Sequence, residues 1–384
     1  MPDDRIEQAG LVSLMGMAGA LQVSIAVAQA LLVVAGLCWL ALLVVRRERF
    51  SAPRFFWPLA ALAALTLVSA AFSPAPAESL ADSRQLLLFL IVPITYRLLS
   101  GRRGTTMITI IVTVGAASAA FGIFQYGILR YDNLGMRPRG TLGHYMTYSG
   151  LLMLVICAAL SRVLFAPRDR VWAALVMPAL AVAVIVTFTR SAWVGASIAA
   201  ALLLSLKDFR LLALLPVAAV VFFLMAPSSV TARFDSMFNM SDPTNRDRVA
   251  MFRAGRDMIR AHPLLGVGPQ MVERVYPEYR DPDAVEAVVP HLHNVPLQIA
   301  AERGLPALAA WLCFAVMVVF DLFRGLRASR HPVLPAAGLA AMAAMATAGL
   351  FEYNFGDSEF LMLLLVLLTL PFAATRTAAA DTRA

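Results

Sequence analysis

The residues of this chain that could do chemistry gather between Pro227 and Gly304, and the most distinctive run among them is His291-Leu292-His293-Asn294. The stretch from Pro227 to Asn294 holds nine acidic residues, eight arginines and three of the protein's five histidines. A histidine side chain has an ordinary pKa of about 6.5, so its neutral form can take a proton from a hydroxyl group at physiological pH. The histidines of this run are therefore candidates for a general base, and the alternative is that they are structural, which a lone histidine more often is.

Four arginines near this stretch could hold an anion, because a guanidinium is permanently charged and its forked donors fit phosphate oxygens. Arg190 follows an apolar run, where the head group of an anionic lipid would lie; an arginine that merely reaches from the membrane to water is the alternative. Arg248 lies on the apolar face of a predicted helix, pointing toward the protein body; its alternative is a salt bridge with the acids of the same stretch. Arg137 and Arg139 either bind phosphate or anchor a loop.

The chain that positions these residues is a membrane protein by composition. Of its 384 residues, 60% are hydrophobic and 15% are charged, and its apolar runs reach the roughly 17 to 25 residues that cross a bilayer as a helix. Alanine and leucine dominate these runs, which predicts an all-α polytopic fold. The net charge of +8 is nearly all arginine and indicates membrane topology, so no nucleic-acid partner is expected. The three cysteines lie in apolar runs, which predicts neither a disulfide nor a thiolate metal site.

About twelve membrane-spanning helices are predicted. The run over residues 11–45 is counted as two short spans that meet near Ala28 to Ala30, and a single span there would give eleven in all. The other predicted spans cover residues 56–72, 86–99, 105–128, 145–165, 171–188, 192–206, 210–226, 306–323, 333–351 and 359–373. Arginine and lysine gather in alternate short loops, which places the long loop after residue 226 on the outer side.

This count divides the chain into three parts. Residues 1–226 form transmembrane helices one to nine, residues 227–305 a large, partly helical outer loop, and residues 306–384 helices ten to twelve with a short cytoplasmic tail. Bilayer hydrocarbon cannot satisfy irregular backbone or so many charges, so the loop must lie in water or roof a cavity. The sequence therefore predicts that the loop covers the site.

Within the loop, capping residues and prolines predict two helical segments. Ser241-Asp242-Pro243 begins and Ala261-His262-Pro263 ends a helix over residues 243–261. A short helix follows the histidines, and Asn294, Gln298 and Glu302 recur along it every four positions. Residues with this spacing share one helix face, so the three side chains are predicted to face the same cavity as the histidines.

Four motifs occur in order around the large loop. They are Arg139-Gly140-Thr141-Leu142-Gly143-His144, Phe188-Thr189-Arg190-Ser191-Ala192, the helix from Arg248 that ends in His262-Pro263-Leu264-Leu265-Gly266-Val267-Gly268, and the stretch His293-Asn294-Val295-Pro296-Leu297-Gln298-Ile299-Ala300-Ala301-Glu302-Arg303-Gly304-Leu305-Pro306. Together they resemble the O-antigen ligase and polymerase superfamily, over roughly residues 85 to 325. The sequence departs from the family pattern at Phe252, where tryptophan is typical, and at Gln270, where glycine is typical.

The resemblance implies a multi-pass protein of the bacterial inner membrane whose active site lies on the periplasmic face. Its members move a glycan from undecaprenyl diphosphate to a sugar hydroxyl of lipid A core, with inversion and without a metal or other cofactor. Mapped onto this sequence, the family's catalytic residues are Arg190, Arg248 and His293. Asn294 favours His293 over His291 as the base. Substrate-binding roles are expected for Arg137, Arg139, His144, His291, Asn294, Gln298 and Glu302.

Other functions remain open at this point. A polymerase of the same superfamily would lengthen the glycan on its carrier instead of transferring it to lipid A core. A polysaccharide transporter or flippase is less favoured, because the middles of the predicted spans carry few ionisable residues. A metal site has little support, since the outer loops show no histidine pair at helical i, i+4 spacing and no cysteine ligands.

Overall fold

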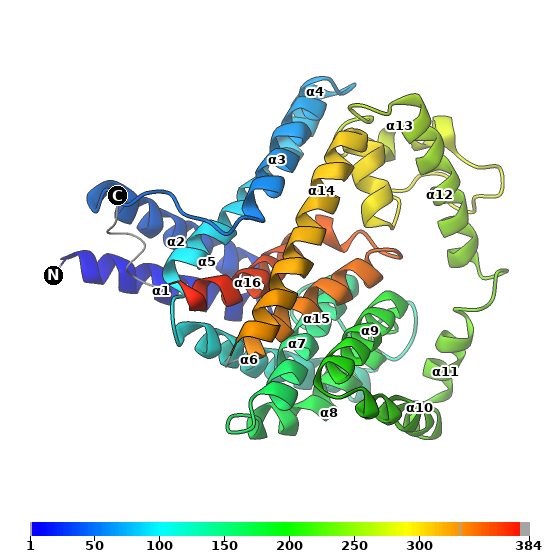
Figure 1. The fold of residues 1–384 in the computed structure, drawn as a ribbon. Coiled ribbons are helices and arrows are strands. Elements are labelled where there is room, and N and C mark those ends of the chain that lie inside the picture. Colours follow the sequence, from blue (N-terminus) through cyan, green and yellow to red (C-terminus); the bar gives the residue numbers. More distant parts are fainter. Residues whose placement is uncertain (1, 330–331, 377–384) are drawn as a thin grey trace.

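The computed structural model describes residues 2–329 and 332–376 of the chain. Over these residues it contains helices and connecting loops and no strand, so the predicted all-α class is confirmed. The helices are α1 (Pro2–Ala20), α2 (Ile25–Val45), α3 (Phe56–Ala71), α4 (Pro76–Asp82), η1 (Ser83–Leu90), α5 (Ile91–Leu98), α6 (Arg103–Gly127), α7 (Tyr145–Phe165), α8 (Val171–Val186), α9 (Arg190–Lys207), η2 (Phe209–Ala213), α10 (Leu214–Met225), α11 (Ser228–Asp235), α12 (Pro243–Ala261), α13 (Val272–Tyr279), α14 (Val295–Ala328), α15 (Val333–Ala348), η3 (Asn354–Gly356) and α16 (Ser358–Thr375) (Figure 1).

The predicted apolar runs fall on helices, although the run over residues 86–99 is divided between η1 and α5 and the run over 210–226 between η2 and α10. Among the described residues, five helices are long and apolar enough to cross a membrane: α2, α6, α7, α14 and α16. Four shorter apolar segments accompany them, namely α3, α8, η2 with α10, and α15. The first run does divide in two, but its turn lies at residues 21–24, so the predicted junction near Ala28 to Ala30 is wrong. The number of spans stays a prediction.

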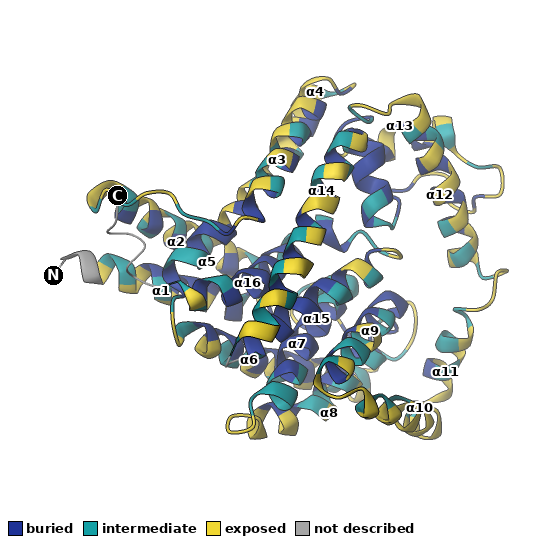
Figure 2. Cartoon of the chain, in the orientation of Figure 1, coloured by how far each residue is buried: buried dark blue, intermediate teal, exposed yellow. Residues whose placement is uncertain are grey.

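The interior is formed by α7, α15 and α16, which Figure 2 shows as mostly buried. Leucine, alanine and methionine cover all sides of these helices, so each can pack against several neighbours at once. Helix α9 packs against α7 and α15. This arrangement fixes the first residues of α9 and the loop between α15 and α16, and both contribute to the site described below.

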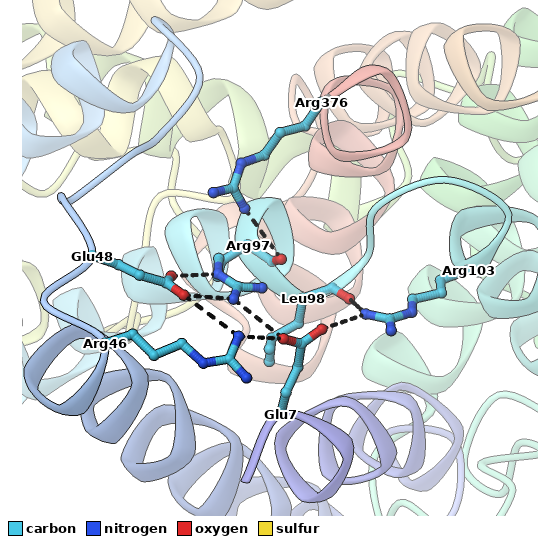
Figure 3. Close-up of polar contacts among 7 residues, drawn as sticks. All are labelled: Glu7, Arg46, Glu48, Arg97, Leu98, Arg103 and Arg376. Atoms are coloured by element: carbon cyan, nitrogen blue, oxygen red, sulfur yellow. Dashed lines mark hydrogen bonds and ion pairs between the residues drawn. The ribbon is translucent and has the colours of Figure 1, made fainter. Parts of the chain in front are cut away.

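A charged cluster ties the N-terminal helix to the rest of the fold, on the side of the molecule away from α12 and α13 (Figures 1 and 3). Glu7 accepts hydrogen bonds from Arg46, Arg97 and Arg103 at 3.0, 3.3 and 3.1 Å. Arg97 also pairs with Glu48. Glu7 and Glu48 neutralise part of the positive charge of Arg46, Arg97 and Arg103. These residues lie on or next to α1, α2, α5 and α6, so ion pairs add to the packing between these helices.

The loop predicted over residues 227–305 contains α11, α12 and α13. Helix α12 spans Pro243–Ala261, as predicted, and the Asp242 side chain caps it by accepting a hydrogen bond from the backbone N–H of Thr244 at 3.0 Å. Beyond α12 the chain turns back and pairs with the beginning of α14. The sequence signals for the ends of this helix were therefore sufficient to place it.

Residues 262–294, which we call the docked segment, are held to the beginning of α14 by backbone contacts. Val267 N–H donates to Ala301 O at 2.9 Å, and Leu305 N–H donates to Pro263 O at 2.8 Å. Gly304 has a φ of +82°, and a Cβ added there would lie 2.1 Å from the carbonyl oxygen of Leu264. Only glycine allows this approach. The docked segment is consequently fixed to α14 at its kink.

Residues 208–242, which we call the arch, contrast with the docked segment. The arch comprises η2, α10 and α11 and connects α9 to α12. Helix α10 has no buried residue, and α11 buries only Val230. Two arginines bind the arch to α9 and to the turn before it: Arg233 donates to Phe188 O at 3.3 Å, and Arg190 donates to Ser236 O at 3.0 Å. With the packing of η2 and of Phe222 against α9, these contacts hold an arch that buries little of its own surface.

Candidate active site

The position of His293 is set by the residues around the beginning of α14. The Asn294 side chain caps the helix by accepting from Leu297 N–H at 2.9 Å and donates to Leu350 O at 3.0 Å. Val295 N–H donates to Gly349 O at 2.7 Å. These bonds join α14 to the end of α15, so the imidazole of His293 lies beside the loop that connects α15 to α16.

Glu352, in that loop, is the polar partner of His293. Its carboxylate oxygens lie 3.1 and 3.0 Å from Nδ1 of His293. Nε2 of His291 lies 3.9 Å from the same carboxylate, and the two imidazole rings are 4.1 Å apart between centroids. A histidine whose Nδ1–H is held by a carboxylate has Nε2 available to accept a proton, so the arrangement suits a general base.

The pKa values of the two neighbours agree with this assignment. Burial, reinforced by the adjacent His293, lowers the pKa of His291 to about 4, so His291 is neutral at physiological pH. Burial alone would raise the pKa of Glu352, but the hydrogen bond and charge of His293 outweigh it and hold that pKa below its usual range. Glu352 is therefore a carboxylate and acts as an acceptor.

Four arginines line a polar cavity of about 290 Å³ next to this group: Arg137, Arg190, Arg233 and Arg248. Burial, together with the charge of Arg248, lowers the pKa of Arg190, and burial beside Arg190 lowers the pKa of Arg233 to about 10. All four stay charged at neutral pH. Nη2 of Arg190 and Nε of Arg248 are buried without a hydrogen-bond partner. Crowded cations with unpaired donors predict an anionic ligand here.

A second cavity, of about 630 Å³, adjoins the polar one and is mainly apolar. Both cavities are lined by Arg190, Ser191, Arg248 and His293. The apolar side is formed largely by aromatic and aliphatic residues, among them Phe234, Phe238, Phe252, Leu297, Leu350 and Phe351. The two cavities together fit an amphiphilic ligand whose anionic part lies at the arginines and whose apolar part extends under the arch.

The structure brings together six of the residues predicted for the site. Arg190, Arg248 and His293 line both cavities, Arg137 lines the polar one and Asn294 the apolar one. His291 adjoins them through Glu352. The Arg137 guanidinium also lies 4.2 Å from the centre of the Tyr145 ring, which orients it.

Four further predicted residues line neither cavity. Arg139 is exposed and bonds to Gly143 O at 3.5 Å, and His144 is exposed, stacks on Tyr145 and lies near enough to His291 for its charge to help lower the pKa of that imidazole. Gln298 and Glu302 are buried, and each accepts from a backbone N–H: Leu292 N–H at 2.7 Å and Gln270 N–H at 2.9 Å. Gln298 and Glu302 thus hold the docked segment and line neither cavity, so of the predicted polar stripe only Asn294 lines a cavity.

Two residues of the site were absent from the sequence prediction. Glu352 lies 59 positions from His293, between two apolar helices, and no local spacing connects them. Its place in a loop on the predicted outer side was the available signal. Arg233 lies in the short helix α11, which the sequence analysis did not identify. Both residues reach the site through tertiary packing alone.

Comparison with known proteins gives one match that bears on function. Residues 174–312 match the family model described as O-antigen ligase. No curated protein matches the sequence. The matched range contains Arg190, Arg233, Arg248 and both histidines of the site, which agrees with the resemblance found in the motifs. Over residues 174–312 the chain is therefore similar to the O-antigen ligase family, and this match supports the resemblance to that superfamily.

Proposed function

We propose that this protein is an O-antigen ligase, which transfers a glycan from undecaprenyl diphosphate to a sugar hydroxyl of lipid A core. The reaction inverts the anomeric carbon and needs no metal ion. We place the protein in the bacterial inner membrane with residues 227–305 on the periplasmic side. The observation that carries the proposal is the position of His293, which is paired with Glu352 where an arginine-lined cavity meets an apolar one.

The family and the helices support the outline of this function. Members of the family are glycosyltransferase-like enzymes that act on lipid-linked glycans, and the apolar helices indicate a membrane-embedded protein. A lipid-linked donor is an amphiphile with a diphosphate between its sugar and its polyprenyl chain. The arrangement of the two cavities suits that order of groups.

In the proposed step, the acceptor hydroxyl attacks the anomeric carbon of the donor while the bond from that carbon to the phosphate oxygen breaks. The hydroxyl proton passes to Nε2 of His293, and the electrons of the broken bond leave with undecaprenyl diphosphate. Glu352 holds Nδ1–H of the ring and stabilises the imidazolium that forms. A single displacement from the opposite face inverts the configuration, and no covalent intermediate with the protein is needed.

The arginines have the second role, which is to stabilise the departing diphosphate. Nη2 of Arg190, which lies 3.8 Å from the Asp242 carboxylate, and Nε of Arg248 are buried without a hydrogen-bond partner, so a phosphate can bind there without breaking an existing hydrogen bond of those atoms. Donors that are already oriented stabilise charge more effectively than water, because they need no reorganisation as the charge develops. The part of the polyprenyl chain next to the diphosphate would occupy the apolar cavity.

The test is glycan transfer by the purified protein in buffer that contains a chelator, with undecaprenyl diphosphate-linked glycan as donor and lipid A core as acceptor. The wild type is expected to form the product, and His293→Ala is expected to lose at least about 100-fold in kcat. His262→Gln is the matched control, since His262 is exposed in the same loop and contacts Tyr279. Transfer by His293→Ala at the wild-type rate would remove the proposed base.

The same assay separates the alternatives. Glycan that lengthens on the carrier without product on lipid A core would identify a polymerase, and turnover only after a metal is restored would contradict the proposed mechanism. In cells, Arg190→Ala and Arg248→Ala should stop transfer while carrier-linked glycan accumulates on the periplasmic face. Accumulation on the cytoplasmic face would favour a transporter.

A further inference from the structure

His291, His293 and Glu352 have a geometry that the proposed base reaction does not require. One nitrogen from each histidine and one carboxylate oxygen all lie within 4.8 Å of one another. Nδ1 of His293 is 3.0 Å and Nε2 of His291 is 3.9 Å from the carboxylate. Ligand atoms around a tetrahedral zinc ion are about 3.3 Å apart, given zinc–nitrogen bonds of about 2.05 Å. The three side chains are therefore close to a metal-binding arrangement.

The chemical types also fit a particular class of ion. Two imidazoles and one carboxylate favour a borderline divalent transition metal such as Zn²⁺ over Mg²⁺ or Ca²⁺, which prefer oxygen ligands alone. The side chains of His291, His293 and Glu352 are 28%, 21% and 12% exposed, so an ion can reach them. A fourth coordination position would remain for water.

We propose that these three side chains bind Zn²⁺ and that the bound ion inhibits the enzyme. To coordinate a metal through Nδ1, a neutral His293 must carry its proton on Nε2, and Nε2 then has no lone pair to accept a proton from a hydroxyl. The metal also takes over Glu352, which otherwise orients the ring. Metal binding and base catalysis thus exclude each other at His293. The inhibitory part of this inference rests on the proposed function, whereas the binding part does not.

The surrounding charges set the strength of binding. The positive charge of Arg248 acts on Glu352, and it opposes a divalent cation at this carboxylate. Binding is therefore expected in the micromolar range, weaker than at a structural zinc site. A lipid-linked glycan whose diphosphate binds at the arginines would offset part of this opposing charge.

The binding test uses the full-length purified protein and Zn²⁺ alone, titrated by calorimetry, with His291→Gln and Glu352→Gln as variants. The wild type should bind one ion per chain, and each variant should bind about tenfold more weakly or worse. His262→Gln should bind as the wild type does. Size-exclusion profiles and thermal unfolding without metal establish that each variant is folded. Equal Zn²⁺ binding by the wild type and both variants would overturn the site, because the ion would then lie elsewhere.

Co²⁺ provides a second measurement that does not depend on activity. Its visible absorption spectrum reports coordination by nitrogen and oxygen ligands, so the wild type should give a spectrum that His291→Gln changes and His262→Gln preserves. For inhibition, micromolar Zn²⁺ should reduce transfer, and added chelator should restore it. If Zn²⁺ binds at these ligands but transfer is unchanged, the metal site stands and the role of His293 as base fails. If no ion binds to the wild type while His293→Ala is inactive, the proposed metal site is wrong and the role of His293 as base is retained.

Discussion

The docked segment and the arch both adjoin the site, yet the structure holds them in opposite ways. The docked segment pairs its backbone with α14, and the Ser69 hydroxyl of α3 lies 2.6 Å from Leu265 O and 2.9 Å from Glu302 O of α14. The arch has few buried residues and is joined to α9 and to the turn before it through Arg190, Arg233 and the contact of Phe222 with Trp193. The difference separates two requirements of the site, which are a fixed base and access for a large substrate.

The docked segment positions His293, whereas the arch, which is held more loosely, covers the apolar cavity. A base must be placed to a fraction of an ångström to take a proton in the transition state. A long lipid chain needs an opening, and segments with few buried contacts open at low free-energy cost. Substitutions in the docked segment should therefore affect the rate of chemistry and stability, and substitutions in the arch should affect substrate binding.

The largest effect is expected for Gly304→Ala. The added Cβ would meet the carbonyl oxygen of Leu264 at 2.1 Å in a backbone conformation with φ of +82°, so the docked segment must separate from α14. We expect a loss of more than about 3 kcal/mol of stability, together with loss of transfer. Thermal unfolding in detergent measures the loss of stability, and the transfer assay measures the loss of activity.

Gly101→Ala is the matched control for this change. Gly101 also has a positive φ, +61°, but a Cβ there would have no atom within 4 Å. Gly101→Ala should lower the free energy of unfolding by about 1 kcal/mol, which is the strain of the left-handed backbone alone. Equal losses for the two variants would show that the close approach at Gly304 does not hold the docked segment.

The next effect is expected for Glu352→Gln, which removes the negative charge beside His293 and keeps the side chain's size. The amide no longer stabilises the imidazolium, so kcat should fall by about 10- to 100-fold with little change in KM. Steady-state kinetics at saturating acceptor measure this. An increase in KM at constant kcat would mean that Glu352 binds substrate and does not position the base.

How far the sequence predicts this site follows from the kind of signal that each residue carries. Helix α12 was placed because Asp242 and Pro243 mark its start and His262-Pro263 its end. The roles of Gln298 and Glu302 were not evident, because helical spacing gives a shared face without saying what that face contacts. Glu352 and Arg233 approach the site through packing between distant segments, so no pattern along the chain contains them.

A smaller effect is expected for Arg233→Ala, in the arch. Arg233 lines the polar cavity and donates to Phe188 O, so its loss should weaken binding of the diphosphate. The KM for the donor should rise by about tenfold, with a smaller change in kcat. Arg256→Ala, which removes an exposed arginine paired with Asp257, should leave KM unchanged. An unchanged KM in Arg233→Ala would exclude this residue from donor binding.

The smallest effect is expected for Leu224→Ala in α10. Leu224 is 79% exposed and packs against no core of the protein, so its removal should change stability by less than about 0.5 kcal/mol. Thermal unfolding of the purified variant checks this. A loss of more than about 2 kcal/mol would show that α10 packs against protein, and the contrast between the arch and the docked segment would then be smaller than the structure indicates.

Leu292, between the two histidines, anchors both of them through its buried side chain. It is 2% exposed and packs against α12, where a Cβ on Gly255 would lie 2.8 Å from it. The backbone bends at His291 and again at His293, whose φ is +49°, and with Leu292 buried between them both imidazoles lie beside Glu352. Inserting one residue after Leu292 would separate the following histidine from this buried anchor, and we expect it to leave Glu352. The proposed base thus depends on an apolar neighbour that takes no part in the chemistry.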